Sequence, residues 1–323
     1  MNGTGNNLPE SFTTVSPEAW TGIFIYTGVF VVAAIGNVSA FVCILNLIRR
    51  RPSPMNKLLL HLNIADLIVV FVLIPSEIGW RLSIGWYAGD IPCRLVQYFR
   101  VFGLYLSALI VTCITLNRYY AVLYPLRSLN GNNRVRIMIY SSWIGATLCS
   151  APQVVIFRVA SHPEYNQFFQ CVSDSLGEKG EIANGIFNLV VLYFVPLVTI
   201  IFSYGSILHK ITQDSVTTVT DDDNVILRRS GASVLERART RTTILTGGII
   251  IVFLIFWTPY VIVVLWELID GDSLVLVSSY LQDLFFIMVL GNSTFNPLVY
   301  GWLYRAKNSR RIQRGFGMCA KSE

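Results

Sequence analysis

The chain has 323 residues, of which 53% are hydrophobic and only 14% are charged, with a formal net charge of +6 at pH 7. Soluble domains carry about 25% charged residues, so this deficit, with a mean hydropathy of +0.55, excludes an ordinary soluble protein. We predict an all-α membrane protein, a seven-transmembrane helix bundle with a short amphipathic eighth helix.

Seven apolar stretches reach the roughly 20 residues that a membrane-spanning helix needs. They lie near residues 20–48, 57–81, 92–123, 135–157, 184–211, 238–268 and 275–302. Residues 1–19 then form a segment before the bundle, residues 20–302 the bundle itself, and residues 303–323 an amphipathic helix and tail. This division leaves no room for a second domain.

The basic residues are distributed unevenly between the two ends of these stretches. Of 25 Lys and Arg residues, those near one end are Arg81, Arg94, Arg100, Arg158 and Lys179, and the others lie near the opposite end. Cytoplasmic loops carry the Lys/Arg excess, so we predict a multi-pass plasma-membrane protein with an extracellular N-terminus. The net charge then reflects topology and contact with membrane lipid, and nucleic acid is not an expected partner.

The extracellular side carries two further predicted features. The first 19 residues contain no apolar core, so we expect no cleavable signal peptide, and Asn2-Gly3-Thr4 is a glycosylation sequon at Asn2.

Cys93 begins the third stretch and Cys171 lies in the long loop after the fourth. Both face an oxidising compartment, which favours a disulfide; the alternative is two free thiols.

Asp66 lies in the middle of the second apolar stretch. A carboxylate inside hydrocarbon requires polar partners, and Asn37, Asn292, Ser293 and Asn296 lie at comparable depth in other stretches. Two interpretations stay open. The residues form a hydrogen-bond network alone, or the network also holds a sodium ion at Asp66, Asn292 and Asn296. We expect no other cofactor.

Asn117, Arg118 and Tyr119 close the third stretch at its cytoplasmic end. The fork of donors on Arg118 suits backbone carbonyls and polar partners, and Tyr204 and Tyr300 end two other stretches on the same side. This pattern predicts an activation switch. The alternative is an arginine that extends its charged head to the interface.

Prolines interrupt several of the stretches. Pro259 lies within the sixth, directly after Trp257 and Thr258, and Phe253 precedes Trp257 by one turn; Pro297 lies in the seventh. A proline removes a backbone hydrogen bond and kinks a helix, so Trp257 and Phe253 could couple a ligand to rotation of the lower half of the helix. Ordinary aromatic packing is the alternative. Pro75 and Pro196 predict two further kinks.

Arg100 is the sharpest ligand-binding candidate, with Glu77 as its counter-charge. It could anchor the carbonyl and amide groups of a peptide, or the two residues could form a closed ion pair that holds two helices together. The remaining candidates for the cavity wall are Trp80, Gln97, Tyr98, Tyr193, Tyr260, Trp266, Glu267 and Asp283.

The residues after Tyr300 alternate between apolar and basic at helical spacing. This predicts an interfacial amphipathic helix, and Cys319 beyond it is a candidate palmitoylation site or a free thiol.

Other seven-helix functions fit poorly. The stretch 275–302 contains no lysine for a retinal Schiff base, and the three histidines lie near stretch ends or in loops, which disfavours an intramembrane protease.

Taken in chain order, the sequence motifs of this protein resemble those of the rhodopsin-like (class A) family of G-protein-coupled receptors. They are Gly36-Asn37, Ala65-Asp66, Cys93, Asn117-Arg118-Tyr119, Trp143, Pro196, Trp257-Thr258-Pro259 and Asn296-Pro297-x-x-Tyr300. Together they cover all seven stretches.

A narrower similarity is to the adipokinetic hormone, corazonin and gonadotropin-releasing hormone receptor group, with adipokinetic hormone receptors nearest. It is carried by Glu77 to Trp80, Arg100 to Ser107, Tyr119 to Pro125 and His162 to Cys171.

The resemblance implies a receptor rather than an enzyme. It implies a short amidated peptide ligand, contacts from Glu77 and Arg100, and coupling mainly to the Gq class with calcium release. The implied partners are a peptide hormone, a heterotrimeric G protein, arrestin and receptor kinases. A vasopressin/oxytocin-like or corazonin-type peptide receptor of the same fold is the alternative.

Three residues depart from the family pattern. Asn117 replaces the Asp usual before the arginine, Phe256 replaces the Cys usual before the tryptophan, and Arg239 lies near the place where many relatives carry an acid. With no carboxylate beside Arg118, the resemblance implies a less restrained inactive state.

Overall fold

The computed structural model describes residues 9, 12–50, 52–124, 131–173, 177–217, 229–270, 281, 283–299 and 301, with backbone alone for 178, 211–217 and 229–242. The predicted features at Asn2, Tyr300 and Cys319, and the predicted amphipathic helix within 303–323, lie outside the described residues.

Nine labelled α-helices, two π-helical turns and one hairpin of strands make up the described fold. In chain order they are α1 (Pro17–Arg50), α2 (Pro54–Ile68), η2 (Val69–Leu73), α3 (Ile74–Ser83), α4 (Asp90–Leu123), α5 (Gly131–Ser150), α6 (Pro152–Ile156), β1 (Arg158–Ser161), β2 (Phe169–Val172), α7 (Gly177–Leu189), η5 (Val190–Phe194), α8 (Val195–Thr217) and α9 (Arg229–Ile269).

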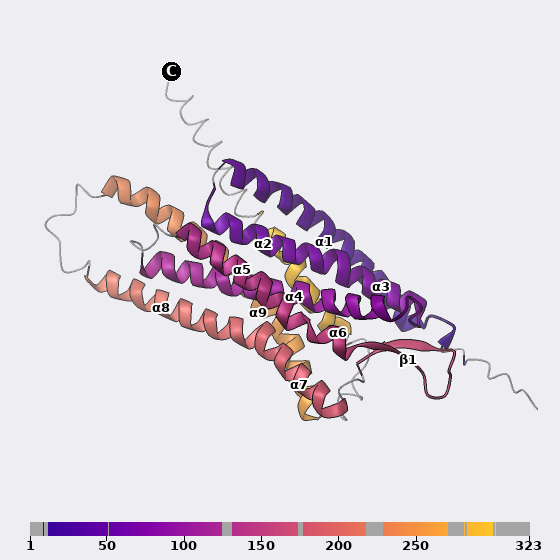
Figure 1. The fold of residues 1–323 in the computed structure, drawn as a ribbon. Coiled ribbons are helices and arrows are strands. Elements are labelled where there is room, and N and C mark those ends of the chain that lie inside the picture. Colours follow the sequence, from indigo (N-terminus) through magenta and orange to yellow (C-terminus); the bar gives the residue numbers. More distant parts are fainter. Residues whose placement is uncertain are drawn as a thin grey trace, which may run out of the picture.

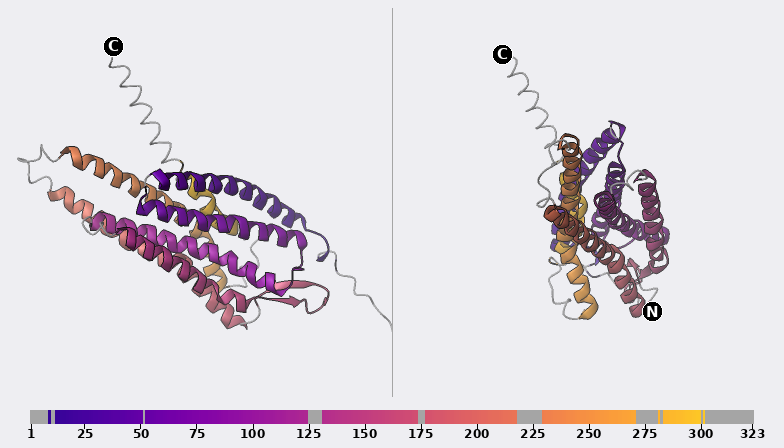
Figure 2. Two further views of the ribbon diagram at one scale, coloured as in Figure 1. Left: turned by 45° about the horizontal axis from the view of Figure 1, so that its top comes forward. Right: turned by 90° about the vertical axis from the view of Figure 1, so that its left-hand side faces the viewer.

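A further helix, Asp283–Val299, follows α9. The long helices run side by side, and β1 and β2 lie at one end of the bundle (Figures 1 and 2). We call this the hairpin end.

Within the described residues, five helical stretches are long and apolar enough to cross a membrane. They are Pro17–Arg50, Pro54–Ser83, Asp90–Leu123, Lys179–Lys210 and Thr243–Ile269, and the shorter helix Asp283–Val299 is also apolar. The predicted stretch 135–157 is divided between α5 and α6, with Pro152 opening the second helix. The other predicted spans agree with these helices to within a few residues at most ends.

Pro75 and Pro196, where kinks are predicted, each follow a π-helical turn. η2 precedes Ile74-Pro75, and η5 precedes Val195-Pro196. A proline lacks its N–H and its ring crowds the carbonyl four residues earlier. Such turns are a common cause of kinks, and here the extra residue in the turn relieves that crowding without ending the helix.

Helix α4 lies at the centre of the bundle, where it packs against α2, α5 and α8. Leu106, Ile110 and Ile114 are fully buried along it. Gly103 permits the closest approach, because a Cβ atom there would lie 3.0 Å from Cγ2 of Val69. Small residues at helix contacts are favoured within membranes, where association depends on close packing.

Phe256 occupies space that a glycine on the neighbouring helix leaves free. Its ring lies 4.8 Å from that of Phe295, and a Cβ atom added to Gly291 would lie 2.4 Å from the Phe256 ring. The large side chain that departs from the family pattern therefore depends on the absence of a side chain at position 291.

We predict that Gly291→Ala lowers the stability of the protein by about 1–3 kcal/mol, because the added methyl group overlaps the Phe256 ring. The thermal unfolding midpoint of the detergent-purified protein measures this effect. Gly79→Ala is the matched control, since nothing lies within 4 Å of a Cβ at that helical position. In a Phe256→Leu background the cost of Gly291→Ala should largely vanish; an unchanged cost would contradict the proposed overlap.

Candidate functional site

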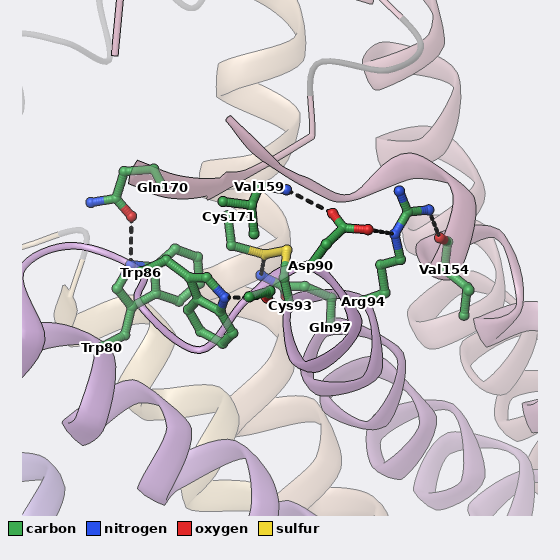
Figure 3. Close-up of a disulfide and its surroundings, with 11 residues drawn as sticks. Trp80, Trp86, Asp90, Cys93, Arg94, Gln97, Val154, Val159, Gln170 and Cys171 are labelled. Carbon is green, nitrogen blue, oxygen red and sulfur yellow. Dashed lines mark hydrogen bonds and ion pairs between the residues drawn. A yellow bond between two sulfur atoms is a disulfide. The ribbon is translucent and has the colours of Figure 1, made fainter. Parts of the chain in front are cut away.

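The hairpin end is fixed to the centre of the bundle by a disulfide. Cys93 in the first turn of α4 is bonded to Cys171 in β2, with the two Cα atoms 5.7 Å apart, so the predicted disulfide is present in the structure (Figure 3). β1 and β2 pair antiparallel, with Arg158 opposite Val172 and Val159 opposite Cys171. The bond therefore holds the whole hairpin over α4.

Two groups of hydrogen bonds fix the hairpin further. On one side, the Trp80 indole donates to Oε1 of Gln170 over 2.8 Å, and Nε2 of Gln170 donates to the carbonyl of Ile84 over 2.6 Å. On the other, Asp90 accepts from the Val159 amide and from Arg94 (Figure 3). The hairpin is thus tied to α3 and α4 at once, which sequence reasoning did not predict.

A cavity of about 810 Å³ opens at the hairpin end between the N-terminal segment, α3 and α4. Four of the ten predicted ligand-binding residues line it: Glu77, Trp80, Gln97 and Arg100. Gln97 also lies beside the disulfide, with its Nε2 3.8 Å from Sγ of Cys171. The other lining residues are Thr14, Val15, Ser16, Pro17, Ala19, Arg81, Ile84 and Phe157.

Charged side chains form a connected network at the floor of this cavity. Nη2 of Arg100 donates to Oε1 of Glu77, so the predicted pair is closed in this structure. Nε of Arg81 lies 4.0 Å from the other oxygen of Glu77, and Arg81 makes a bidentate contact with Asp283 through its two terminal nitrogens. The network joins α3, α4 and the helix Asp283–Val299.

Aromatic rings lie against both arginines of the network. The Arg100 guanidinium carbon is 5.7 Å from the Trp80 ring centroid, and that of Arg81 is 5.0 Å from the ring of Tyr26. Cations over aromatic faces gain about 0.5–2 kcal/mol, more when desolvated. Positive charge near the apolar bundle is therefore balanced by two carboxylates and two rings.

The other six predicted ligand-binding residues lie elsewhere. Tyr98 stacks on Phe102, because it points about 100° around α4 from Gln97. Asp283 contacts Arg81 instead of lining the cavity. Tyr260 is half-buried between Trp257 and Phe286, within electrostatic reach of Arg100 and Glu267. Trp266 and Glu267 are exposed near the end of α9.

Tyr193 belongs to a buried stack beneath the cavity. Its ring lies 5.9 Å from that of Phe253, which lies 6.1 Å from Trp257, and its hydroxyl is 2.8 Å from that of Thr258. Thr258 directly precedes Pro259, the proline inside α9. The predicted coupling residues Trp257 and Phe253 are therefore in contact with one another, and Phe253 also contacts η5.

A buried polar cluster lies in the middle of the bundle. Asn296 donates to Oδ2 of Asp66 over 2.9 Å. Asn37 donates to the carbonyl of Ser293 and accepts from Asn63. The hydrogen-bond network predicted around Asp66 therefore joins α1, α2 and the helix Asp283–Val299. Pro297 packs close to Gly36 on α1 at the same level.

Among the described residues, the same cluster contains buried oxygens without a hydrogen-bond partner. They are Oδ1 of Asn63, Asp66 and Asn296 and Oγ of Ser107, and the side chains of Asn296 and Ser107 lie close to the Asp66 carboxyl group. Asn292 is also buried on the helix that carries Asn296. Carboxylate, amide and hydroxyl oxygens suit a hard cation, so these residues fit a sodium ion.

At the end opposite the hairpin, Asn117 and Arg118 are both buried. No carboxylate among the described side chains forms an ion pair with Arg118, and Tyr204 of α8 lies within electrostatic reach of it. The hydroxyl of Tyr204 in turn lies close to Thr246 on α9. Tyr119 is only partly buried and contacts the ring of Phe202 on α8. These residues connect α4, α8 and α9.

Sequence reasoning missed Arg81, Ile84, Phe157 and the N-terminal residues Thr14, Val15, Ser16, Pro17 and Ala19 as parts of the cavity. Arg81 could have been found, because it lies four residues after Glu77 and therefore on the same face of the helix. The N-terminal residues carry no such signal, since their position depends on the packing of a segment outside the bundle.

Reversing one charge of the Arg81–Asp283 pair should destabilise the ligand-free protein. We expect Arg81→Asp to lower its stability by about 2 kcal/mol or more, because the charged hydrogen bonds are lost and two carboxylates face each other. The double variant Arg81→Asp/Asp283→Arg should recover most of the loss. Thermal unfolding of all three proteins tests this, and a double variant as unstable as the single one would contradict it.

The chain matches the family described as 7 transmembrane receptor (rhodopsin family) over residues 36–300. It is 32% identical over 287 residues to the gonadotropin-releasing hormone II receptor of Clarias gariepinus, covering 87% of this chain and 76% of that receptor. It is also 32% identical over 285 residues to the gonadotropin-releasing hormone receptor of Octopus vulgaris, covering 84% and 68%.

The gonadotropin-releasing hormone receptor of Equus caballus is 27% identical over 259 residues, 78% of each chain. These similarities confirm the predicted family and the predicted seven-helix membrane fold. The chain therefore belongs to the rhodopsin family of seven-transmembrane receptors, multi-pass membrane proteins that signal rather than catalyse, and within it to the group that contains the gonadotropin-releasing hormone receptors.

Proposed function

We propose that this chain is a receptor for a short amidated peptide hormone of the adipokinetic or gonadotropin-releasing hormone type. The observation that carries the proposal is the Arg100–Glu77 pair, held at the floor of an open cavity beneath the hairpin. The names of the relatives support the peptide class. The pair is closed in this structure, and the carbonyl and amide groups of a bound peptide would replace part of this contact.

The charge balance of the cavity favours a ligand with uncharged ends. Glu77 already pairs with Arg100, and Asp283 already pairs with Arg81. A terminal carboxylate would compete for an arginine and leave a carboxylate of the protein unpaired, which is costly away from water. A carboxamide can accept and donate hydrogen bonds without that loss. This balance supports the amidated class of ligand.

We propose that ligand contact reaches the opposite end through the stack Tyr193, Phe253 and Trp257 and the kink at Pro259. A rotation of the lower half of α9 would then move Thr246 relative to Tyr204 on α8 and to Arg118 on α4, opening a site for a heterotrimeric G protein of the Gq class. Arrestin and receptor kinases would act on the same end.

Because Asn117 supplies no carboxylate, basal signalling should exceed that of Asn117→Asp; equal basal signalling would remove this idea.

We also propose that the hairpin end faces the outside of the plasma membrane. The Cys93–Cys171 disulfide supports this orientation, because disulfides form and persist in oxidising compartments. The Lys/Arg excess near the other end supports it independently. In this orientation Asn2 would be glycosylated and Cys319 would be available for palmitoylation on the cytoplasmic side.

A deglycosylase should increase the electrophoretic mobility of the receptor, and Asn2→Gln should abolish this shift. This experiment tests the orientation.

The peptide assignment predicts a potent calcium response in cells that express this chain. Amidated peptides of the adipokinetic, corazonin, gonadotropin-releasing and vasopressin/oxytocin types would be compared. Arg100→Ala should weaken the response to the active peptide roughly a hundredfold, because a charged hydrogen bond at the cavity floor is lost. Lys179→Ala is the control, since it removes an exposed positive charge outside the cavity.

A response to the vasopressin/oxytocin-like peptide alone would favour the alternative ligand class of the same fold. Silence toward all four peptides, with the receptor at the cell surface, would contradict the proposed ligand class. Equal potency at the wild-type receptor and Arg100→Ala would contradict the proposed pocket.

We further propose that the Asp66 cluster binds a sodium ion that regulates the receptor, held by Asp66, Asn292 and Asn296. Sodium chloride should raise the thermal unfolding midpoint of the ligand-free receptor above that in choline chloride at equal ionic strength. Asp66→Asn should abolish the difference, because it removes the charged ligand. An equal midpoint in the two salts would mean a hydrogen-bond network without an ion.

A further inference from the structure

The cavity is closed on one side by a segment outside the bundle. Thr14, Val15 and Ser16, together with the first residues of α1, form part of its lining. They add small uncharged side chains to a wall that otherwise carries Glu77, Arg81 and Arg100. The shape of the cavity therefore depends on where residues 13–16 are held.

Each end of this short segment has its own anchor. At one end α1 begins, where the amide of Trp20 donates to the carbonyl of Ser16 over 3.0 Å and that of Ala19 to the Ser16 hydroxyl over 3.2 Å. At the other end the ring of Phe12 lies among three rings of the hairpin loop. Its centroid is 4.6 Å from Phe168, 5.2 Å from Tyr165 and 5.4 Å from His162.

The hairpin is a firm platform for Phe12. The loop closes on itself, because His162 donates to the Phe168 carbonyl over 2.8 Å and Phe168 to the Tyr165 carbonyl over 2.9 Å. Phe168 is buried, and the strands on both sides of the loop are tied to α4 through Cys93–Cys171 and Asp90. Phe12 therefore connects the N-terminal segment to a hairpin that is itself tied to α3 and α4, the helices on the other side of the cavity.

We propose that Phe12 is a positioning residue for ligand binding, and that its aromatic clasp on the hairpin holds residues 13–16 in place as a preformed wall of the cavity. The role in ligand binding rests on the proposed function; the clasp itself does not. Terminal segments are poorly ordered unless they are tied down. A wall that is ordered before binding spares the ligand the entropy of ordering it.

Dissociation kinetics of the active peptide test the role in binding. Phe12→Ala should speed dissociation of the peptide roughly tenfold, because residues 13–16 are no longer held against the bound ligand and differences in affinity appear mainly in the off-rate. Phe12→Trp should restore slow dissociation, since it supplies another ring. Phe24→Ala is the matched control, because that ring is 69% exposed on α1 away from the hairpin. Peptide dissociation from Phe12→Ala as slow as from wild type, or slower, would overturn the proposal.

Cysteine labelling tests the clasp without any ligand. Val15→Cys would be labelled at the cell surface with a bulky membrane-impermeant maleimide, with the receptor lacking this substitution as background. Val15 is half-buried, so adding Phe12→Ala should raise the labelling rate roughly tenfold by freeing the segment. An unchanged rate would overturn the clasp. If wild type binds none of the peptides, the proposed function fails while this experiment still decides the clasp.

Discussion

Polar groups buried inside an apolar bundle must satisfy one another, and the remainder of this structure depends on that constraint. Asp66 is fully buried and accepts from Asn296, while Asn37 connects to Ser293 and Asn63. In lipid no water competes for these bonds, so each one fixes the relative depth of two helices. The cluster ties α1, α2 and the helix Asp283–Val299 at mid-depth, and the elements above and below it take their positions from those helices.

Above the cluster, the hairpin end leaves a cavity that a ligand can enter. The disulfide, the Trp80–Gln170 bond and Asp90 place the hairpin across α3 and α4 without filling the space beneath it. That space is lined by charges that are already paired, which lowers the cost of keeping them near an apolar core. A ligand therefore meets a preformed site whose electrostatics favour exchange of hydrogen bonds over addition of net charge.

Below the cavity, prolines lie inside the long helices and set their local geometry. η2 and η5 widen the helices directly before Pro75 and Pro196, and Pro259 lies one residue from Thr258, which contacts Tyr193. Helices with such defects can change their bend at lower cost than regular ones. These helix defects lie between the cavity and Arg118. A ligand-induced change in the cavity can therefore alter the bend of the helices and so move the residues around Arg118.

The sequence by itself determined the class of protein, because length, hydropathy and buried polar residues such as Asp66 and Arg118 leave few alternatives in a membrane. It also predicted the Cys93–Cys171 bond and the pairing of Glu77 with Arg100. Only the tertiary structure decided which neighbours share a cavity: Gln97 faces it while Tyr98 stacks on Phe102, Asp283 is held by Arg81, and Phe12 meets the hairpin. Helical periodicity fixes the face of a residue within its own helix, whereas the rotation of each helix and the path of a terminal segment follow from packing against distant parts of the chain.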